Sequence, residues 1–210
     1  MERRIKFLKR REIKSVAFQG ERGAFSEQAA IKFFGGNVFP LSTPTFEDVV
    51  KAVIRGRANS GVLPIENSLH GSVLENYDLL LHRHLFIIGE VKLRIVHHLL
   101  AHKTVSLDQI RRVYSHPQAL AQCRSFLKKL SHAEPLAFYD TAGAAKFVVE
   151  QKFADAAAIA SAQAARVYGL KVLARGIENN HQNYTRFLVL ARYPVTATTQ
   201  AKTSVVFTVK

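Results

Sequence analysis

The chain has 210 residues, a formal net charge of +14, 48% apolar residues and 22% charged residues. This balance is typical of a folded domain and excludes a wholly disordered chain. No apolar run is long enough to cross a bilayer, and the basic start lacks the apolar segment of a signal peptide, so we predict neither a membrane partner nor export. The single cysteine, Cys123, cannot form an internal disulfide, which favours a reducing, cytoplasmic location.

The positive charge is unevenly distributed. Residues 1–14 hold seven Lys or Arg and two Glu, so +5 lies in this basic tail and +9 in the rest of the chain. A basic protein can bind nucleic acid or collect anionic metabolites. The chain has no RNA-binding signature and no Trp. We therefore predict no nucleic-acid partner and favour a carboxylate substrate, with a nucleic-acid-binding arm at residues 1–14 as the minority alternative.

The first elements alternate between strand and helix. Residues 15–19 predict a strand, residues 20–23 a glycine turn, and residues 24–34 a helix. The N–H groups at the start of such a helix can bind an anion, although a structural tight turn explains the glycines equally well. A second strand over residues 37–41 and a helix opened by Thr45 follow.

Polar side chains gather at the end of the apolar strand 61–65. Glu66, Asn67 and Ser68 follow this strand, and Gly71 precedes the next helix. Open α/β sheets bind ligands at the carboxyl ends of their strands. A structural turn capped by Asn67 is the alternative, but such a turn does not explain why a carboxylate stands at position 66.

Residues 85–101 are too long for one ordinary strand. We predict two strands with a bend at Gly89, crossing between two lobes. The adjacent His97 and His98 would place their rings on opposite faces of a strand, and no Cys or carboxylate completes a ligand set. We therefore expect no metal and no cofactor.

A second series of units begins after Ala101. A strand at 112–114 leads to Ser115 and Gln118, which open a helix over residues 119–130. This helix start offers free N–H groups, a hydroxyl and an amide to a ligand.

The next unit is a strand at residues 136–139 followed by a helix at 142–153. Asp140 is expected to cap that helix, and Thr141 either belongs to the cap or faces a ligand. The pattern repeats over residues 156–174.

The alternation predicts an α/β fold with mostly parallel sheets covered by helices, in two lobes that face a cleft. A last strand at residues 187–191 is entered through Thr185 and Arg186 and forms the second crossing. A hydroxyl and a guanidinium at the rim of a rigid sheet could hold a small anion.

Five segments, in this order, resemble the signatures of the prephenate dehydratase family. They are GERGAFSE (20–27), LPIENSLHGSV (63–73), SHPQALAQC (115–123), DTAGAA (140–145) and NYTRFLVL (183–190). Any one of them alone would be a weak signal, whereas five in order are a strong one. Plant arogenate dehydratases, which act on the amino analogue of prephenate, look similar in the second and third segments.

The resemblance covers residues 15–192 and implies a catalytic domain of the two-lobed type 2 periplasmic-binding-protein kind. We expect lobe 1 at about 15–93 plus 183–192, and lobe 2 at about 94–182. The family converts prephenate, a dicarboxylate, to phenylpyruvate, water and carbon dioxide in phenylalanine biosynthesis. A homodimer is the family expectation. A non-catalytic two-lobed anion-binding protein is the alternative from another class.

The resemblance also implies roles for residues. Thr185 matches the family's essential threonine, and five residues match positions lining the family's cleft: Asn67, Ser115, Gln118, Arg186 and Phe187. We assign Thr185 to help the hydroxide leave, Arg186 to bind a carboxylate, and Glu66, if buried, to supply a proton. Ser68, Gly71 and Thr141 complete the expected substrate site, and Phe187 is expected to pack in the core.

The C-terminal residues 203–210 look like the first strand of the ACT regulatory domain that usually follows in this family. We therefore expect residues 193–210 to be a linker and a truncated start of that domain, without its phenylalanine-binding site.

Overall fold

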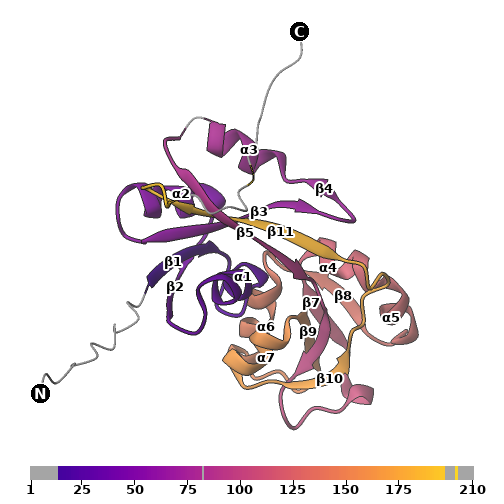
Figure 1. Cartoon of the computed structure of the whole chain (residues 1–210). Helices are drawn as coiled ribbons and strands as arrows, with labels where there is room; N and C mark the ends of the chain where they lie inside the picture. The colour runs from indigo at the N-terminus through magenta and orange to yellow at the C-terminus, as the bar shows by residue number, and fades with distance from the viewer. Residues whose placement is uncertain (1–13, 82, 197–201, 203–210) are drawn as a thin grey trace, which may run out of the picture.

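The computed structural model describes residues 14–81, 83–196 and 202, which form two β-sheets covered by helices (Figure 1). The predicted basic tail, apart from Lys14, and the predicted strand at 203–210 lie outside the described residues. The α/β class, the two sheets and the covering helices agree with the prediction from sequence.

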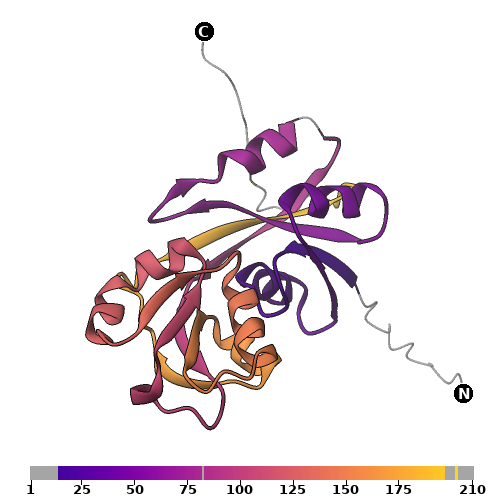
Figure 2. The same ribbon diagram turned by 180° about the vertical axis from the view of Figure 1, so that it is seen from behind.

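The first sheet has the strand order β2-β1-β3-β11-β5, with β4 paired to β3. Its strands are β1 (Lys14–Gln19), β2 (Val38–Thr43), β3 (Ser60–Asn67), β4 (Gly71–Ser72), β5 (Phe86–Arg94) and β11 (Tyr184–Ala191). Its helices are α1 (Phe25–Phe34), α2 (Phe46–Ile54) and α3 (Leu74–Leu81). The view from behind shows α3 along the side of this sheet that lies away from the second sheet (Figure 2).

The second sheet has the order β10-β6-β9-β7-β8. Its strands are β6 (His98–Ala101), β7 (Arg112–Ser115), β8 (Glu134–Ala137), β9 (Ala156–Ala160) and β10 (Lys171–Arg175). Its helices are α4 (Pro117–Gln122), α5 (Arg124–Lys129), α6 (Thr141–Glu150), α7 (Ala162–Tyr168) and the 3-10 helix Leu107–Gln109.

Both sheets are mixed and not mostly parallel as predicted, and the mixture follows from the connections. Strands that alternate with helices pair in parallel, as β1 does with β2 and β3, and β7 with β8 and β9. The strands beside the two crossings between sheets pair antiparallel: β11 with β3 and β5, and β6 with β9 and β10. The chain crosses after β5 and returns before β11, and these two strands lie side by side (Figure 1).

Side-chain caps fix several helix starts. The Asp140 carboxylate accepts hydrogen bonds from the backbone N–H groups of Ala142 (2.6 Å) and Gly143 (2.9 Å), so its predicted role as the cap of α6 is confirmed. Thr45 caps α2 as expected. The helix predicted over residues 119–130 is divided at Cys123 into α4 and α5.

The predicted bend at Gly89 is wrong. Segment 85–101 does contain two strands, but β5 continues through this residue from Phe86 to Arg94, with a register irregularity beside Gly89, and β6 begins only at His98. A Cβ atom at Gly89 would lie 2.3 Å from the ring of Phe33 on α1. Glycine here leaves room for the Phe33 ring of α1 and is not part of a turn.

The glycine turn of the first unit packs against the second sheet. A Cβ atom at Gly23 would lie 2.6 Å from the Cα of Ala164 on α7, and the carbonyl of Gly23 accepts a 2.7 Å hydrogen bond from the Ser161 hydroxyl. Phe18 from β1 belongs to the same buried cluster as α6 and α7. These contacts hold the start of α1 close to the starts of α6 and α7.

Candidate active site

A cavity of about 570 Å³ lies between the two sheets. The first sheet contributes the start of α1, the end of β3 and the beginning of β11. The second sheet contributes the exposed side of α4 and the start of α6. The size suits one small organic molecule, which both sheets would contact at once.

Thr185 contributes a buried hydroxyl group to this cavity wall. It lies on β11 with 8% of its surface exposed, and its Oγ1 accepts a 2.9 Å hydrogen bond from Nδ2 of Asn67. Because this bond uses a lone pair of the oxygen, the hydroxyl hydrogen remains free to point into the cavity. Thr185 is thus oriented as a donor towards a ligand.

Asn67 is itself held in one orientation. Its Oδ1 accepts hydrogen bonds from the backbone N–H groups of Leu69 (3.0 Å) and His70 (3.1 Å). Its Nδ2 donates both to Thr185 and to Oδ1 of Asn183, the latter at 2.8 Å. An amide with both ends engaged cannot rotate without losing bonds, so Asn67 fixes the direction of the Thr185 hydroxyl.

The network continues across the cavity to the second sheet. Gln122 on α4 accepts at Oε1 from Nδ2 of Asn183 (3.0 Å) and from Nε2 of His97 (2.9 Å). Since an amide oxygen only accepts, the proton of His97 resides on Nε2. The Gln122 Nε2 in turn donates to Nε2 of His70 (2.8 Å). Burial lowers the pKa of His97, so this imidazole is held neutral.

Six residues of the site predicted from sequence line the cavity together. They come from both sheets and are Asn67, Gly71, Gln118, Thr141, Thr185 and Phe187. Phe187 is only 2% exposed and belongs to the core cluster beneath the cavity, in agreement with the prediction that it packs in the core.

Four other predicted residues do not line the cavity. Glu66 is exposed, so the condition under which it was predicted to supply a proton, its burial, is not met. Ser68 is also exposed, and its hydroxyl donates to the carbonyl of Gln182 (2.8 Å). Ser115 is fully buried, and its hydroxyl donates to the carbonyl of Ile159 (2.6 Å).

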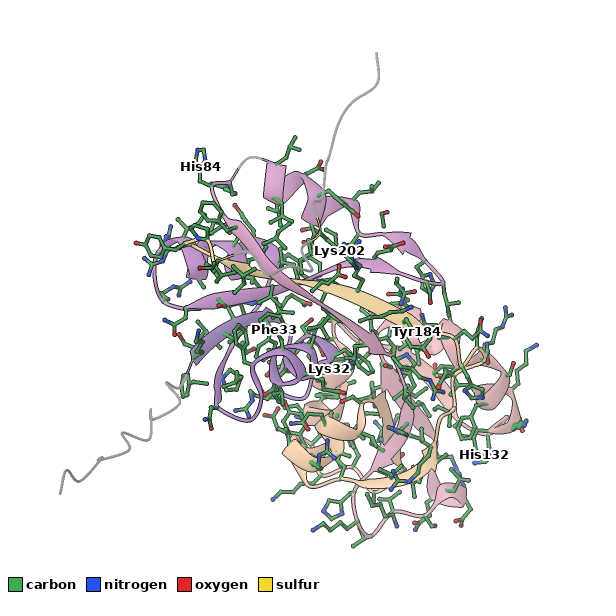
Figure 3. All side chains as sticks on the ribbon, viewed as in Figure 1. Lys32, Phe33, His84, His132, Tyr184 and Lys202 are labelled. Atoms are coloured by element: carbon green, nitrogen blue, oxygen red, sulfur yellow. The ribbon has the colours of Figure 1, made fainter. Side chains whose placement is uncertain are left out.

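Arg186 is the fourth of these residues, and it lies on the opposite face of β11. Its Nε donates to Oε2 of Glu90 (2.8 Å), and its Nη1 lies 3.9 Å from Oε2 of Glu66. Lys202, labelled in Figure 3, also pairs with Glu90. Successive side chains of a strand point to opposite faces, which separates Arg186 from Thr185 and Phe187. The expected direct grip of Arg186 on a carboxylate is therefore not supported by this arrangement.

Gln122, Asn183, His70 and His97 belong to the site but were not predicted. Two of them carried a usable signal, because Gln122 lies four residues after Gln118 on the same helix face and Asn183 opens the segment that contains Thr185. The two histidines gave no such signal, since their common partner is Gln122, which is distant in sequence.

The cavity wall has little permanent charge. No Lys or Arg lines it among the residues that the structure describes, and its acidic lining residues are Glu75 and Asp140. Burial raises the pKa of Asp140, while hydrogen bonds from backbone N–H groups oppose that shift. An anion in this cavity would have to be held by neutral donors.

Tyr139 lies at the edge of the cavity, and its hydroxyl hydrogen is already used. Its phenol donates to Oε1 of Glu21 (3.2 Å), and Lys146 lies 3.2 Å from Oε2 of the same carboxylate. Burial and the nearby Glu21 carboxylate raise the pKa of Tyr139 to about 12, so it stays protonated at neutral pH. The contact links the turn before α1 to the second sheet.

Within residues 14–81, 83–196 and 202, no group of three His, Cys, Asp or Glu side chains is arranged to hold a metal ion. None of the helices described there is both long and apolar enough to cross a bilayer.

Comparison with known proteins shows which family of proteins this chain resembles. The sequence profile of the prephenate dehydratase family matches residues 16–195. Arogenate dehydratase 2 of Petunia hybrida is 52% identical over 194 residues, which cover 91% of this chain and 49% of that protein. The chain therefore spans about half the length of this curated relative.

Two solved structures share the fold. The prephenate dehydratase of Arthrobacter aurescens in complex with L-Phe superposes with a TM-score of 0.79 and 29% identity, covering 87% of this chain and 63% of that one. GqqA, described as a novel type of quorum quenching acylase, superposes with a TM-score of 0.80 and 39% identity, covering 87% and 66% of the two chains. The profile match extends over both described sheets apart from the first two residues of β1, and the chain belongs to the prephenate dehydratase family.

Proposed function

We propose that this chain catalyses the decarboxylating dehydration of prephenate to phenylpyruvate, as a carbon–oxygen lyase of phenylalanine biosynthesis. The observation that carries the proposal is the Thr185 hydroxyl, which accepts from Asn67 and is free to donate into the cavity. The family match supports the same activity.

The reaction needs little more than a well-placed donor. The ring carboxylate of prephenate leaves as carbon dioxide, and its bonding electrons enter the ring while the bond to the ring hydroxyl breaks. The departing oxygen takes up one proton and leaves as water. Because the product ring is aromatic, the enzyme has to orient the substrate and stabilise the leaving oxygen.

Thr185 is suited to that second task as a hydrogen-bond donor and not as an acid. An alkyl hydroxyl has a pKa far above neutral, so the proton that completes water comes from another group or from solvent. Asn67 acts as a positioning residue, because its bonds to Leu69, His70 and Asn183 fix the amide that orients Thr185.

The largely uncharged wall suits the other requirement of the reaction. A cation or strong donor placed on the departing carboxylate would stabilise the substrate ground state and slow the loss of carbon dioxide. The described lining has no Lys or Arg, so such a penalty is avoided.

Arogenate is the second candidate substrate, since the Petunia relative, at 52% identity, carries the name arogenate dehydratase. Arogenate differs from prephenate in one substituent of the side chain, with an ammonium in place of a ketone. The ratio of kcat/KM on the two substrates, measured with the same preparation, would decide which one this chain prefers.

The test of the proposal is to incubate the purified chain with prephenate and to follow phenylpyruvate and carbon dioxide. Equimolar release of both by the wild type, but not by Thr185→Val, would support it. Binding of prephenate without release of carbon dioxide would overturn it in favour of a non-catalytic anion-binding protein.

The remaining assignments are part of the same proposal. They are a catalytic domain at residues 15–192, with lobes at about 15–93 plus 183–192 and at about 94–182, a homodimer, and a cytoplasmic location. Light scattering of the purified chain would test the dimer, and fractionation of the source cells would test the location.

A further inference from the structure

The start of α1 lacks the side-chain cap that three other helices have. A side-chain oxygen caps α2, α6 and α7, namely that of Thr45, Asp140 and Ser161. The N-cap residue of α1 is Ala24, which has no side chain able to cap. An uncapped helix start leaves backbone N–H groups without partners, and Ala24 and the next two residues line the cavity.

The N–H groups concerned can be identified. The N–H of Gly23 is bound by the Glu27 carboxylate, and that of Ala24 donates to the carbonyl of Glu21 (3.0 Å). The N–H groups of the first turn, at Phe25, Ser26 and Glu27, donate to no residue that the structure describes. α1 is ten residues long, so these groups lie at the positive end of a full helix dipole.

An independent sign of a ligand comes from a side chain. Ser26 is only 8% exposed and lines the cavity, yet its hydroxyl makes no hydrogen bond with any described residue. Ser26 Oγ is not one of the fully buried side-chain atoms that lack a partner among the described residues, so it is reached from the cavity and its hydrogen is available to a ligand there. The unpaired hydroxyl and the free N–H groups lie on the same first turn and open onto the same cavity.

The charge at this position also favours an anion. Glu27, in the first turn, turns back to the N–H of Gly23 and is paired with Nε of Arg22 (2.7 Å). Its negative charge is thus balanced by Arg22 and its oxygens are not presented to the cavity. The described lining has no Lys or Arg. The first turn of α1 therefore gives the cavity a partial positive charge that comes from backbone N–H groups and not from an ionised side chain.

The first turn of α1 also adjoins the network around Thr185. The ring of Phe25 meets the ring of His97 edge-on, with centroids 5.5 Å apart, and His97 is bonded to Gln122. Thr185 and Ser26 line the same cavity, so one ligand in it is offered both groups. In prephenate the ring hydroxyl and the three-carbon side chain lie at opposite ends of the ring.

We propose that the Ser26 hydroxyl and the free N–H groups of the first turn of α1 bind the side-chain carboxylate of the substrate, which is the carboxylate that remains in the product. The inference rests on the proposed function, and it adds the direction in which the substrate lies. The ring carboxylate is excluded from this position, because hydrogen bonds to the group that leaves would oppose its loss.

Ligand binding tests the inference without requiring turnover. The probes are phenylpyruvate, which carries the carboxylate, and phenylacetone, which lacks it, titrated into the wild type and into Ser26→Ala by calorimetry. We expect Ser26→Ala to weaken phenylpyruvate binding about 10-fold, as the loss of one hydrogen bond to a charged group does. Phenylacetone binding should change less than about 2-fold by the same reasoning.

Two further variants complete the experiment. Ser26→Thr keeps the hydroxyl and should restore phenylpyruvate binding, while Ser131→Ala changes an exposed serine of a turn and should have no effect. If Ser26→Ala folds poorly, Ser26→Thr and Ser26→Cys, which differ in donor strength, provide the comparison. Equal losses for both probes, no loss for phenylpyruvate, or no phenylpyruvate binding by the wild type would each overturn the inference.

The same preparations separate this inference from the proposed function. Carboxylate-dependent binding that needs Ser26, together with no release of carbon dioxide from prephenate, would leave the subsite intact and refute the activity. Turnover of prephenate with a KM unaffected by Ser26→Ala would support the activity and refute the subsite.

Discussion

On one face of β11, Thr185 and Phe187 line the cavity, whereas on the other face Arg186 forms ion pairs with Glu90 and Glu66. The cavity face is built from neutral groups that orient one another through hydrogen bonds. The outer face is built from charges that partly remain in solvent. Adjacent residues of one short segment thus do different work, and their closeness in sequence says nothing about a shared role.

The largest effect should come from Thr185→Val, which keeps the shape of the side chain and removes the donor from the cavity face. We expect kcat on prephenate to fall about 100-fold, as with other donors to a developing negative charge, while KM changes little. Steady-state kinetics measure both quantities. Thr185→Ser, which keeps the hydroxyl, should retain much of the activity, and full activity of Thr185→Val would remove Thr185 from the mechanism.

Asn67→Ala should have the next largest effect, because it leaves the Thr185 hydroxyl free to rotate. We expect kcat to fall about 10-fold, and a double-mutant cycle should show that the same change adds little once Thr185 is Val. Additive losses in the double variant would mean that Asn67 acts on the substrate independently of Thr185.

Arg186→Met tests whether the outer face of β11 contributes to stability and not to substrate binding. The Arg186 side chain is 35% exposed and pairs with Glu90, and such pairs contribute about 0.5 kcal/mol to stability. We expect a slightly lower melting temperature with KM within about 2-fold of the wild type, and Glu90→Gln should behave alike, as expected for one shared pair. A large rise in KM for Arg186→Met alone would instead show that the guanidinium reaches the substrate.

Acid should reduce the stability contributions of His97, which lines the cavity, and of Glu90, which pairs with Arg186, in different pH ranges. Burial lowers the pKa of His97, so the unfolded chain binds a proton that the folded chain does not, and stability should fall as the pH drops below about 6.5. The hydrogen bonds of Lys202 and Arg186 lower the pKa of Glu90, so its contribution is present above about pH 4.3 and is lost only below that value.

Melting temperatures recorded from pH 7.5 to 5 test the first part. His97→Gln should show a smaller decrease than the wild type, and His132→Gln, at an exposed position, the same decrease. Burial also lowers the pKa of His98, so one variant should remove only part of the slope. Identical slopes for His97→Gln and the wild type would contradict a neutral buried His97.

The local parts of this fold could be predicted from the sequence. Asp140 as a cap, Pro117 at the first turn of α4 and the alternation of strand and helix depend on neighbours in the chain. The alternation of side chains along β11 would also have separated Arg186 from Thr185, had it been applied to that pair.

The rest depends on contacts that are distant in sequence. The hydrogen bond between Asn183 and Gln122 joins residues 61 positions apart. The packing of Phe33 against Gly89 joins α1 to β5, and no sequence pattern in either element indicates this contact. The unpaired state of Ser26 is likewise a property of the folded cavity.

The scarcity of fixed charge around the cavity has a consequence for its response to salt. The chain as a whole carries +14, and yet its described cavity lining offers an anion only dipoles and hydrogen-bond donors. Mobile ions screen interactions between charges much more than they weaken short contacts with oriented dipoles in a shielded site. Added salt would therefore slow the long-range capture of a dianion by this basic protein, while the residence time of the bound molecule would change little.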